Sequence, residues 1–259
     1  MLLEDRVAIV SGIGPGMGRD IALAFAREGA NLVLGARRDK YLTSVAEEIE
    51  SLGRKAIWVQ TDIAQQDQCR ALADAAVGEF GRIDVLVNNA FVQPPIETIE
   101  DNDIEVWRNA FEVNVIGTVQ MTKAVIPAMK EQNNGSIVFI NSMSQRRIQA
   151  KFGAYAATKA ALITTVQTLA REVGAYGIRA NSVVPGYIWG KSLEWFFNQQ
   201  AQARGIAAGD VYEEIASETS LHHIPTSAEI ADAVLFFASD LSRAVTGQAL
   251  DVNAGHWFH

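Results

Sequence analysis

The segment that most constrains the fold lies near the N-terminus, where a short apolar run leads into a glycine-rich loop. Val7-Ala-Ile-Val10 is typical of a buried strand, Ser11-Gly-Ile-Gly-Pro-Gly-Met-Gly18 follows it, and an apolar-periodic helix then ends near Gly29. Glycines permit positive φ and close backbone approach, and a helix start presents free N–H groups and a partial positive charge. This order of elements predicts a cradle for phosphate groups.

The spacing of the glycines differs from the common dinucleotide pattern. G-x-G-x-x-G fails in every register, because Met17, Arg19 and Ile21 stand where the third glycine should be. The spacing that fits is Gly12-x3-Gly16-x-Gly18. Taken alone, this glycine spacing is equally consistent with a loop that only reverses the direction of the chain. Its place after a strand and before a helix favours cofactor binding.

Short apolar runs and longer helical segments alternate along the rest of the chain, which is typical of a parallel sheet covered by helices on both faces. Lys40 to Leu52 and Gln66 to Phe80, for example, carry apolar residues at helical spacing. No proline- or glycine-rich linker divides the 259 residues. We therefore predict one α/β domain over 1–259 with a doubly wound, Rossmann-type, seven-stranded parallel sheet. The predicted strands are 7–11, 31–35, 55–60, 83–88, 136–141, 178–184 and 249–252.

A second pattern indicates proton-transfer chemistry. Tyr155-Ala-Ala-Thr-Lys159 places a phenol and an ammonium one helical turn apart, and Ser142 lies thirteen residues upstream. A free tyrosine has a pKa of about 10, and a nearby cation favours the phenolate. Taken alone, the pair reads as an ordinary helix-surface pair. Beside a phosphate cradle, it favours a site where one carbonyl oxygen meets all three groups.

Ligands of doubly wound sheets bind beyond the carboxyl ends of the strands. Polar or glycine-rich segments follow several of the predicted strands, and we expect them to converge on one cleft. These segments are Ser11–Gly18, Gly35–Arg38, Asp62, Asn89, Ser142 and Pro185-Gly186.

Taken in order, these elements closely resemble the short-chain dehydrogenase/reductase family over nearly the whole chain. The resemblance implies hydride transfer between a nicotinamide cofactor and a carbonyl or alcohol. The matching elements are Ser11-Gly12-x3-Gly16-x-Gly18, Asp62, Asn88-Asn89-Ala90, Asn114, Ser142, Tyr155-x3-Lys159, Pro185-Gly186 and Val245-Thr-Gly-Gln248.

The candidate catalytic residues are Asn114, Ser142, Tyr155 and Lys159. Tyr155 would exchange a proton with the substrate oxygen, and Ser142 would hold that oxygen and stabilise its developing charge. Lys159 would lower the pKa of the phenol and bind the nicotinamide ribose. Asn114 falls in a helical stretch, Asp103 to Lys130, among apolar neighbours, so we expect a buried amide with hydrogen-bond partners. In the resembling family, such an asparagine holds a proton-relay water.

Cofactor choice is predicted at the end of the second strand, Leu32-Val-Leu-Gly-Ala36-Arg37-Arg38. An NAD-selective protein is expected to place a carboxylate where Ala36 stands, and Arg37 suits a 2′-phosphate. We predict NADP, with NAD as the alternative; Arg38 is equally well explained as a solvated residue opening the next helix. The expected cofactor-binding residues are Gly12, Gly14, Gly16, Met17, Gly18, Arg37, Arg38, Asp62, Ile63, Asn89, Tyr155, Lys159 and Ile188.

Three positions depart from the family pattern. Phe91 replaces a glycine after Asn-Asn-Ala, which puts a ring near the expected nicotinamide position. Gly190 replaces a threonine, so a hydrogen bond to the carboxamide would come from Ser192 or from backbone. The closing segment Asp251-Val-Asn-Ala-Gly255 lacks a glycine pair. These departures affect substrate orientation more than chemistry.

Residues from about 186 to 225 would form a substrate lid rich in aromatic rings. The rings indicate a bulky apolar or aromatic alcohol or ketone, or they pack the lid's own small core. Two alternatives to an NADP-dependent enzyme stay open: an NAD-dependent alcohol dehydrogenase of the same family, and a non-catalytic nucleotide-binding regulator. The rings are Tyr187, Trp189, Trp195, Phe196, Phe197 and Tyr212.

Composition narrows the partners. A formal net charge of −8 argues against a nucleic-acid surface and leaves a small-molecule substrate. Charge at residues 4–6 precedes any apolar run long enough for a signal peptide or membrane span, so we expect a cytoplasmic protein. The single cysteine, Cys69, forms no internal disulfide, and no Cys/His spacing resembles a metal site. The family resemblance, surplus apolar residues in 103–130 and 153–173, and Trp257-Phe258 predict a homotetramer.

Overall fold

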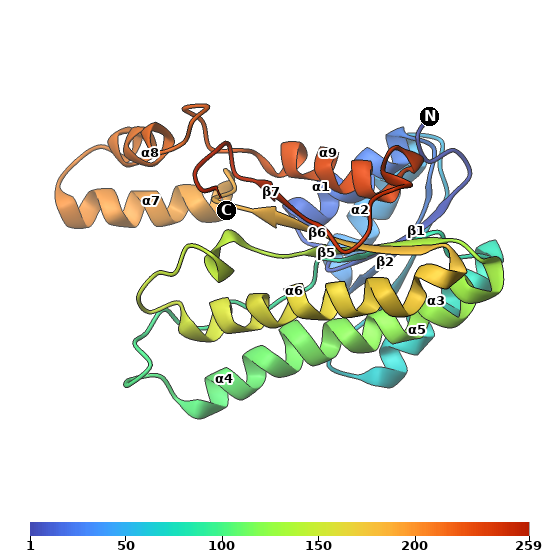
Figure 1. The fold of residues 1–259 in the computed structure, drawn as a ribbon. Helices are drawn as coiled ribbons and strands as arrows, with labels where there is room; N and C mark the ends of the chain where they lie inside the picture. Colours follow the sequence, from blue (N-terminus) through green and yellow to red (C-terminus); the bar gives the residue numbers. More distant parts are fainter. Residues whose placement is uncertain (259) are drawn as a thin grey trace.

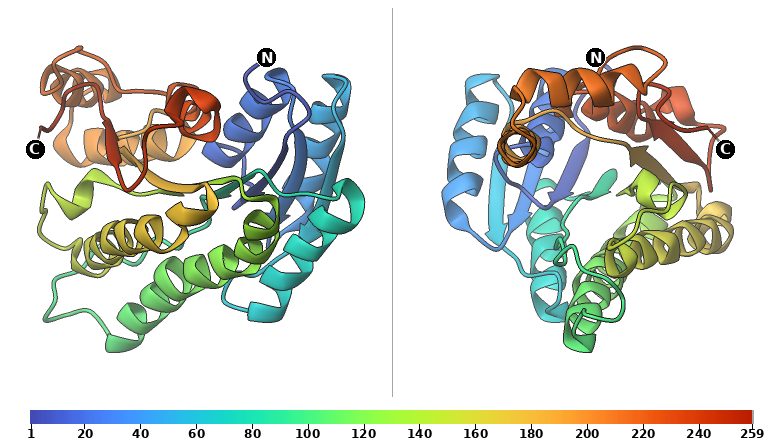
Figure 2. Two further views of the ribbon diagram at one scale, coloured as in Figure 1. Left: turned by 45° about the vertical axis from the view of Figure 1, so that its right-hand side comes forward. Right: turned by 90° about the vertical axis from the view of Figure 1, so that its left-hand side faces the viewer.

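Seven parallel strands form the centre of the molecule, and helices cover both faces of the sheet (Figures 1 and 2). A computed structural model describes residues 1–258. The strand order β3-β2-β1-β4-β5-β6-β7 confirms the predicted doubly wound sheet, and each predicted strand is present with its bounds shifted by two residues or fewer. The strands are β1 (Val7–Ser11), β2 (Asn31–Ala36), β3 (Ala56–Gln60), β4 (Val85–Asn88), β5 (Gly135–Ile140), β6 (Ile178–Pro185) and β7 (Ala249–Val252).

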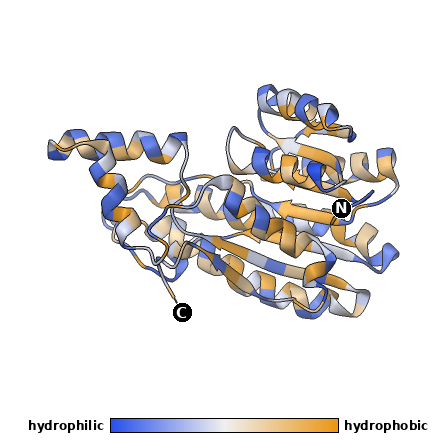
Figure 3. Cartoon of the chain, turned by 90° about the horizontal axis from the view of Figure 1, so that it is seen from above, coloured by the Kyte–Doolittle hydropathy of each residue, from blue (hydrophilic) through white to orange (hydrophobic). Residues whose placement is uncertain are grey.

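Two helical layers cover the sheet. One layer consists of α1 (Met17–Arg27), α2 (Asp39–Ser51) and α9 (Ser227–Ala238), and the other of α3 (Gln66–Phe80), α5 (Thr118–Gln132) and α6 (Gly153–Val173). Successive side chains of a strand point to opposite faces: Ala8 and Val10 pack on the first layer, and Val7 and Ile9 on the second. Both faces of the central strands β1, β4 and β5 are buried, and these strands are mainly apolar, while the helices carry both colours in Figure 3.

The stretch from 103 to 130 is not one regular helix as predicted. It divides into α4 (Ile104–Phe111), a wider π-helical segment (Glu112–Gly117) and α5. Gly117 brings this turn against the loop after β3, where a Cβ would lie 2.8 Å from Ile63 Cγ1. The wider turn holds the buried Asn114, and π-helical turns occur frequently at functional sites.

Two further helices, α7 (Lys191–Arg204) and α8 (Ala208–Ser217), lie together at one end of the molecule (Figure 1). They enclose a small apolar cluster of their own, which includes Phe197, Val211 and Ile224. The remaining helical turns are short: Met143–Gln145, Gly174–Tyr176 and Asp240–Ser242. Within residues 1–258, no helix has the length and apolar character needed to cross a membrane.

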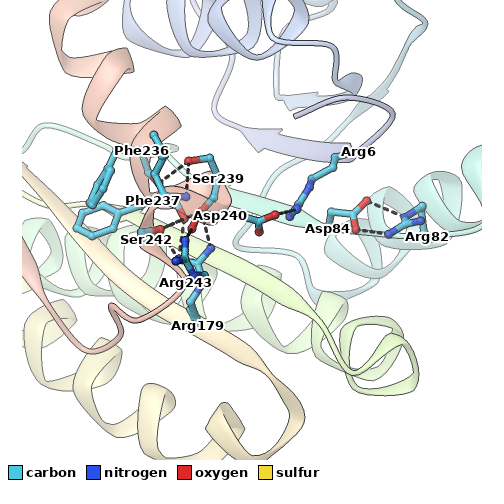
Figure 4. A network of polar contacts seen from close by, with 11 residues as sticks. Arg6, Arg82, Asp84, Arg179, Phe236, Phe237, Ser239, Asp240, Ser242 and Arg243 are labelled. Atoms are coloured by element: carbon cyan, nitrogen blue, oxygen red, sulfur yellow. Dashed lines mark hydrogen bonds and ion pairs between the residues drawn. The ribbon is translucent and has the colours of Figure 1, made fainter. Parts of the chain in front are cut away.

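A polar network ties the end of α9 to the sheet (Figure 4). Arg179 on β6 donates to Phe237 O at 2.9 Å, to Ser239 O at 3.1 Å and to Ser242 Oγ at 2.6 Å. Burial lowers the pKa of this guanidinium. The carbonyls at a helix C-terminus lack partners within the helix. Here Arg179 adds a charged donor to carbonyls that also accept from the hydroxyls of Ser136 and Ser242. Asp240 in the same turn pairs with Arg6 at 2.6 Å, which anchors the chain just before β1.

We expect Arg179→Met to destabilise the fold by about 2–4 kcal/mol, because several partly buried acceptors would lose a charged donor. The matched control is Arg243→Met, because Arg243 is exposed in the same network and its side chain donates to Asp240 O at the long distance of 3.5 Å. That change should cost less than about 0.5 kcal/mol. Urea unfolding followed by circular dichroism measures both values. Equal stabilities for the two variants would contradict the role assigned to Arg179.

Candidate active site

Two cavities adjoin at the carboxyl ends of the strands. The first, of about 310 Å³, lies over the glycine-rich loop and the end of β2, and we call it the glycine-loop cavity. The second, of about 450 Å³, contains Tyr155 and is called the tyrosine cavity. Gly16, Met17, Asn89 and Phe91 line both, so the two form one continuous cleft. The cleft lies where the strand order reverses between β1 and β4.

Close backbone contacts shape the glycine loop. Gly12 has a φ of 105°, and a Cβ there would collide with the backbone nitrogen of Ala90. Asn89 Nδ2 donates to Gly12 O at 2.6 Å, and Gly12 O also excludes a Cβ at Gly18. Gly14, by contrast, faces open space.

The start of α1 completes this cradle. The helix begins at Met17 without a side-chain cap, so its first turn presents free N–H groups to the cavity. Gly16, directly before it, faces open space as Gly14 does. An uncapped helix start beside unfilled glycines fits a pyrophosphate.

The end of β2 forms the far wall of the glycine-loop cavity. Ala36, Arg37 and Arg38 line it together with Asp62 and Ile63, as expected from the sequence. Asp62 is the only carboxylate among the described lining residues, and its Oδ1 accepts from Ala64 N at 3.0 Å. The exposed Arg37 therefore faces a wall with little negative charge. Arg38 lies 6.0 Å from the ring centre of Tyr41 at the start of α2.

Three of the four candidate catalytic side chains meet in the tyrosine cavity. Tyr155 and Lys159 come from successive turns of α6, and Ser142 follows the end of β5. Lys159 Nζ donates to Ile140 O at 2.8 Å and lies 5.6 Å from the ring centre of Tyr155. Ile188, an expected cofactor contact, lines the same cavity.

Burial dominates the titration of the phenol and the ammonium. It raises the pKa of Tyr155 to about 12, and a hydrogen bond with Ser142 offsets part of this rise. It also lowers the pKa of Lys159 to about 8. The expectation that Lys159 lowers the pKa of the phenol stays a prediction, because in this structure burial is the largest cause of the Tyr155 shift and the Ser142 hydrogen bond is the effect that opposes it. The phenol is a protonated donor at neutral pH.

Asn114 lies behind the cleft rather than in its lining. Its Oδ1 accepts from Val92 N at 2.8 Å, and its Nδ2 donates to Val92 O at 3.1 Å and to Thr158 Oγ1 at 3.3 Å. The expected buried amide with real partners is present. These bonds tie the segment after Phe91 to α6 next to Lys159. The side chain thus holds the wall of the cleft in place.

Two of the three departures from the family pattern, Phe91 and Gly190, lie at the cleft. The ring of Phe91 is 6.2 Å from that of Tyr155. Gly190 and Ser192 both line the tyrosine cavity at the start of α7. In the closing segment, Asp251 pairs with Arg146 at 2.7 Å. Phe91 and Gly190 therefore border the space around Tyr155, whereas the closing segment is not among the described residues that line it.

The lid rings divide between the two roles that the sequence allowed. Trp189 lines the tyrosine cavity and also contacts Tyr212 edge-on, with ring centres 4.8 Å apart. Phe197 is buried in the small core between α7 and α8, with Tyr187, Phe196 and Tyr212 packed around it. Trp195 is 64% exposed. Most rings therefore pack the lid itself, and one contributes to the cavity.

The sequence interpretation missed one hydroxyl beside the site. Ser144 Oγ donates to Ser142 Oγ at 3.0 Å. The available signal was the Ser-Met-Ser spacing after a strand, since a serine there caps the turn two residues on.

Among residues 1–258, no group of three His, Cys, Asp or Glu side chains could hold a metal ion.

Comparisons with known proteins agree with this geometry. A family model described as enoyl-(acyl carrier protein) reductase matches residues 12–256. The chain is 36% identical over 254 residues to an uncharacterized oxidoreductase of Methylorubrum extorquens, covering 98% of both chains. It is 32% identical to a short chain dehydrogenase/reductase of Aspergillus oryzae, covering 98% of this chain and 95% of that protein. The structure superposes with a TM-score of 0.92 on carveol dehydrogenase from Mycobacterium avium in complex with NAD, at 27% identity over 98% of each chain.

Proposed function

Because the chain belongs to the short-chain dehydrogenase/reductase family, we propose that it transfers a hydride between NADP(H) and a carbonyl compound or secondary alcohol. The observation that carries the proposal is the continuous cleft: a phosphate cradle at one end and a phenol, a hydroxyl and an ammonium at the other. A dinucleotide would lie along this cleft, with its pyrophosphate at the start of α1.

In this proposal the nicotinamide cofactor supplies or accepts the hydride, and the side chains handle the proton. During reduction, Tyr155 gives its phenolic proton to the carbonyl oxygen, and Ser142 donates a hydrogen bond to the same oxygen as negative charge develops. The ammonium of Lys159, held by Ile140 O, stabilises the negative charge of the phenolate that forms. During oxidation, Tyr155 takes the proton of the alcohol.

The expected loss on replacing Tyr155 with phenylalanine is about 10²- to 10⁴-fold in kcat/KM, because the ring still packs while the transferable proton is gone. Cofactor affinity, measured by fluorescence titration, should change little. Lys159→Ala should impair both turnover and cofactor binding. Initial rates on a panel of ketones and alcohols measure the effect.

The pH dependence of the wild type provides the control for this role. Burial keeps the phenol protonated, so reduction needs no change of its ionisation near neutrality. Oxidation needs the phenolate, so its kcat/KM should rise with pH through the alkaline range, toward the raised pKa of Tyr155. A Tyr155→Phe enzyme that keeps more than about a tenth of wild-type kcat/KM would contradict the mechanism.

The coenzyme preference rests on the far wall of the glycine-loop cavity. Arg37 lines this wall, Ala36 takes the place of an acidic residue, and Asp62 is its one described carboxylate. A guanidinium binds a 2′-phosphate through charge-assisted hydrogen bonds. The carveol dehydrogenase neighbour carries NAD, which keeps an NAD-dependent alcohol dehydrogenase as the second candidate.

Arg37→Ala should erase most of the preference for NADPH and leave the use of NADH nearly unchanged. A charge-assisted bond of about 1.5–3 kcal/mol corresponds to a preference of roughly 10- to 150-fold. Values of kcat/KM with both coenzymes measure it. Arg27→Ala is the matched control, because Arg27 is exposed in the last turn of α1 and does not line the cavity. A wild type that uses NADH as well as NADPH would overturn the assignment.

We propose a bulky apolar or aromatic substrate, because Phe91, Trp189 and Leu193 line the tyrosine cavity and no carboxylate is among its described lining residues. The third candidate, a nucleotide-binding regulator without catalysis, has no use for a buried ammonium beside a phenol and a hydroxyl. The substrate panel separates these candidates, since a regulator would bind the coenzyme without turnover.

We further propose that the protein acts in the cytosol as a homotetramer. The family resemblance supports this assembly, and Phe258 and Trp257 are 73% and 43% exposed, which leaves apolar surface for a neighbouring copy. Light scattering at micromolar concentration should give about four times the chain mass. A monomer under those conditions would remove this part of the proposal.

A further inference from the structure

Ser144 lies beside the proposed reaction centre. Its backbone N–H and its side-chain hydroxyl both donate hydrogen bonds to the same atom, Ser142 Oγ. Its N–H donates to Ser142 Oγ at 3.2 Å, and its hydroxyl donates to the same oxygen at 3.0 Å. The short turn Met143–Gln145 imposes this geometry, since Ser142 caps its start in an extended conformation. Ser144 is itself absent from the described lining of the tyrosine cavity.

The valences of a hydroxyl group decide what this contact does. A serine oxygen accepts two hydrogen bonds and donates one. The Ser144 N–H can only donate, and the Ser144 hydroxyl takes the second acceptor site. The single hydrogen of Ser142 is then left to point away from the turn, toward Tyr155 and the cavity that Ser142 lines.

We propose that Ser144 is a positioning residue for the hydride-transfer reaction: by filling both acceptor sites of Ser142 Oγ, it makes Ser142 an obligate donor to the substrate oxygen. The inference rests on the function proposed above. It assigns no contact between Ser144 and the substrate or cofactor. Donors aimed at an oxygen before charge develops there stabilise the transition state without reorganisation, and a hydroxyl that already accepts two bonds is a stronger donor.

A set of five enzymes tests the inference: wild type, Ser144→Ala, Ser144→Thr, Ser142→Ala and the Ser142→Ala/Ser144→Ala double variant. Ser144→Ala should lower kcat by about 3- to 15-fold, the value of one hydrogen bond. KM and the cofactor dissociation constant should stay within about twofold. Ser144→Thr keeps the hydroxyl and should retain most of the activity. In the Ser142→Ala background, Ser144→Ala should have no further effect on kcat.

The pH profile gives a readout that a purely structural role would not move. A weaker Ser142 donor stabilises the Tyr155 phenolate less, so in Ser144→Ala the oxidation profile should shift to higher pH. Melting temperatures identify a folding defect, and Ser144→Cys, of similar size but a weaker donor, should then show an intermediate loss of kcat.

The outcomes distinguish a failure of the positioning role of Ser144 from a failure of the proposed hydride-transfer function. Unchanged kcat in Ser144→Ala, or an equal loss in the Ser142→Ala background, overturns the positioning role alone, provided Ser142→Ala itself is impaired. A wild type that turns over no ketone or alcohol, or a fully active Ser142→Ala, overturns the proposed function and this inference with it. A loss in Ser144→Ala that is rescued by threonine and disappears in the double variant supports it.

Discussion

The contact between Gly12 and the chain that leaves β4 is the constraint on which the rest of the structure depends. β1 is the strand at which the order reverses, since it pairs with β2 on one side and β4 on the other. The segments that follow β1 and β4 therefore lead to opposite faces of the sheet, and the cleft opens between them at Gly12. Asn89 joins these two segments by donating a hydrogen bond to Gly12 O, and the packing leaves no room for a Cβ at Gly12. One packing requirement thus fixes both the phosphate cradle and the shared wall of the two cavities.

The reacting end of the cleft depends on burial in a different way. Lys159 is 4% exposed, and its ammonium finds one protein acceptor, Ile140 O. The same low-dielectric surroundings push the pKa of Tyr155 upward and that of Lys159 downward, so both groups are shifted toward their neutral forms. A neutral phenol at this position can give its proton to a bound carbonyl oxygen, whereas the reverse reaction needs the phenolate.

Short apolar runs were enough to predict all seven strands. The signal is clearest for β1, β4 and β5, which are buried on both faces and are therefore mainly apolar. The convergence of Ser142, Tyr155 and Lys159 followed from the same topology. The π-helical turn at Asn114 could not be predicted, since it depends on Gly117 packing against Ile63, which is distant in sequence. The pKa of Tyr155 was missed for a related reason: helical spacing gives proximity to Lys159 but says nothing of burial.

Side-chain contacts between loops hold the segment that follows Ser142. Arg146, shortly after Ser142, pairs with Asp251 of the closing segment, and Arg147 binds Glu218 beyond α8 at 3.0 Å.

His256 completes this link, because it contacts both Arg147 and Glu218 and stacks on Tyr187 with ring centres 5.7 Å apart. The segment that carries Ser142 is therefore tied to the lid and to the C-terminal segment by side chains that take no part in the proposed proton transfer. Relatives that keep the tyrosine, lysine and serine but change these loop residues would keep the chemistry and alter the orientation of the substrate.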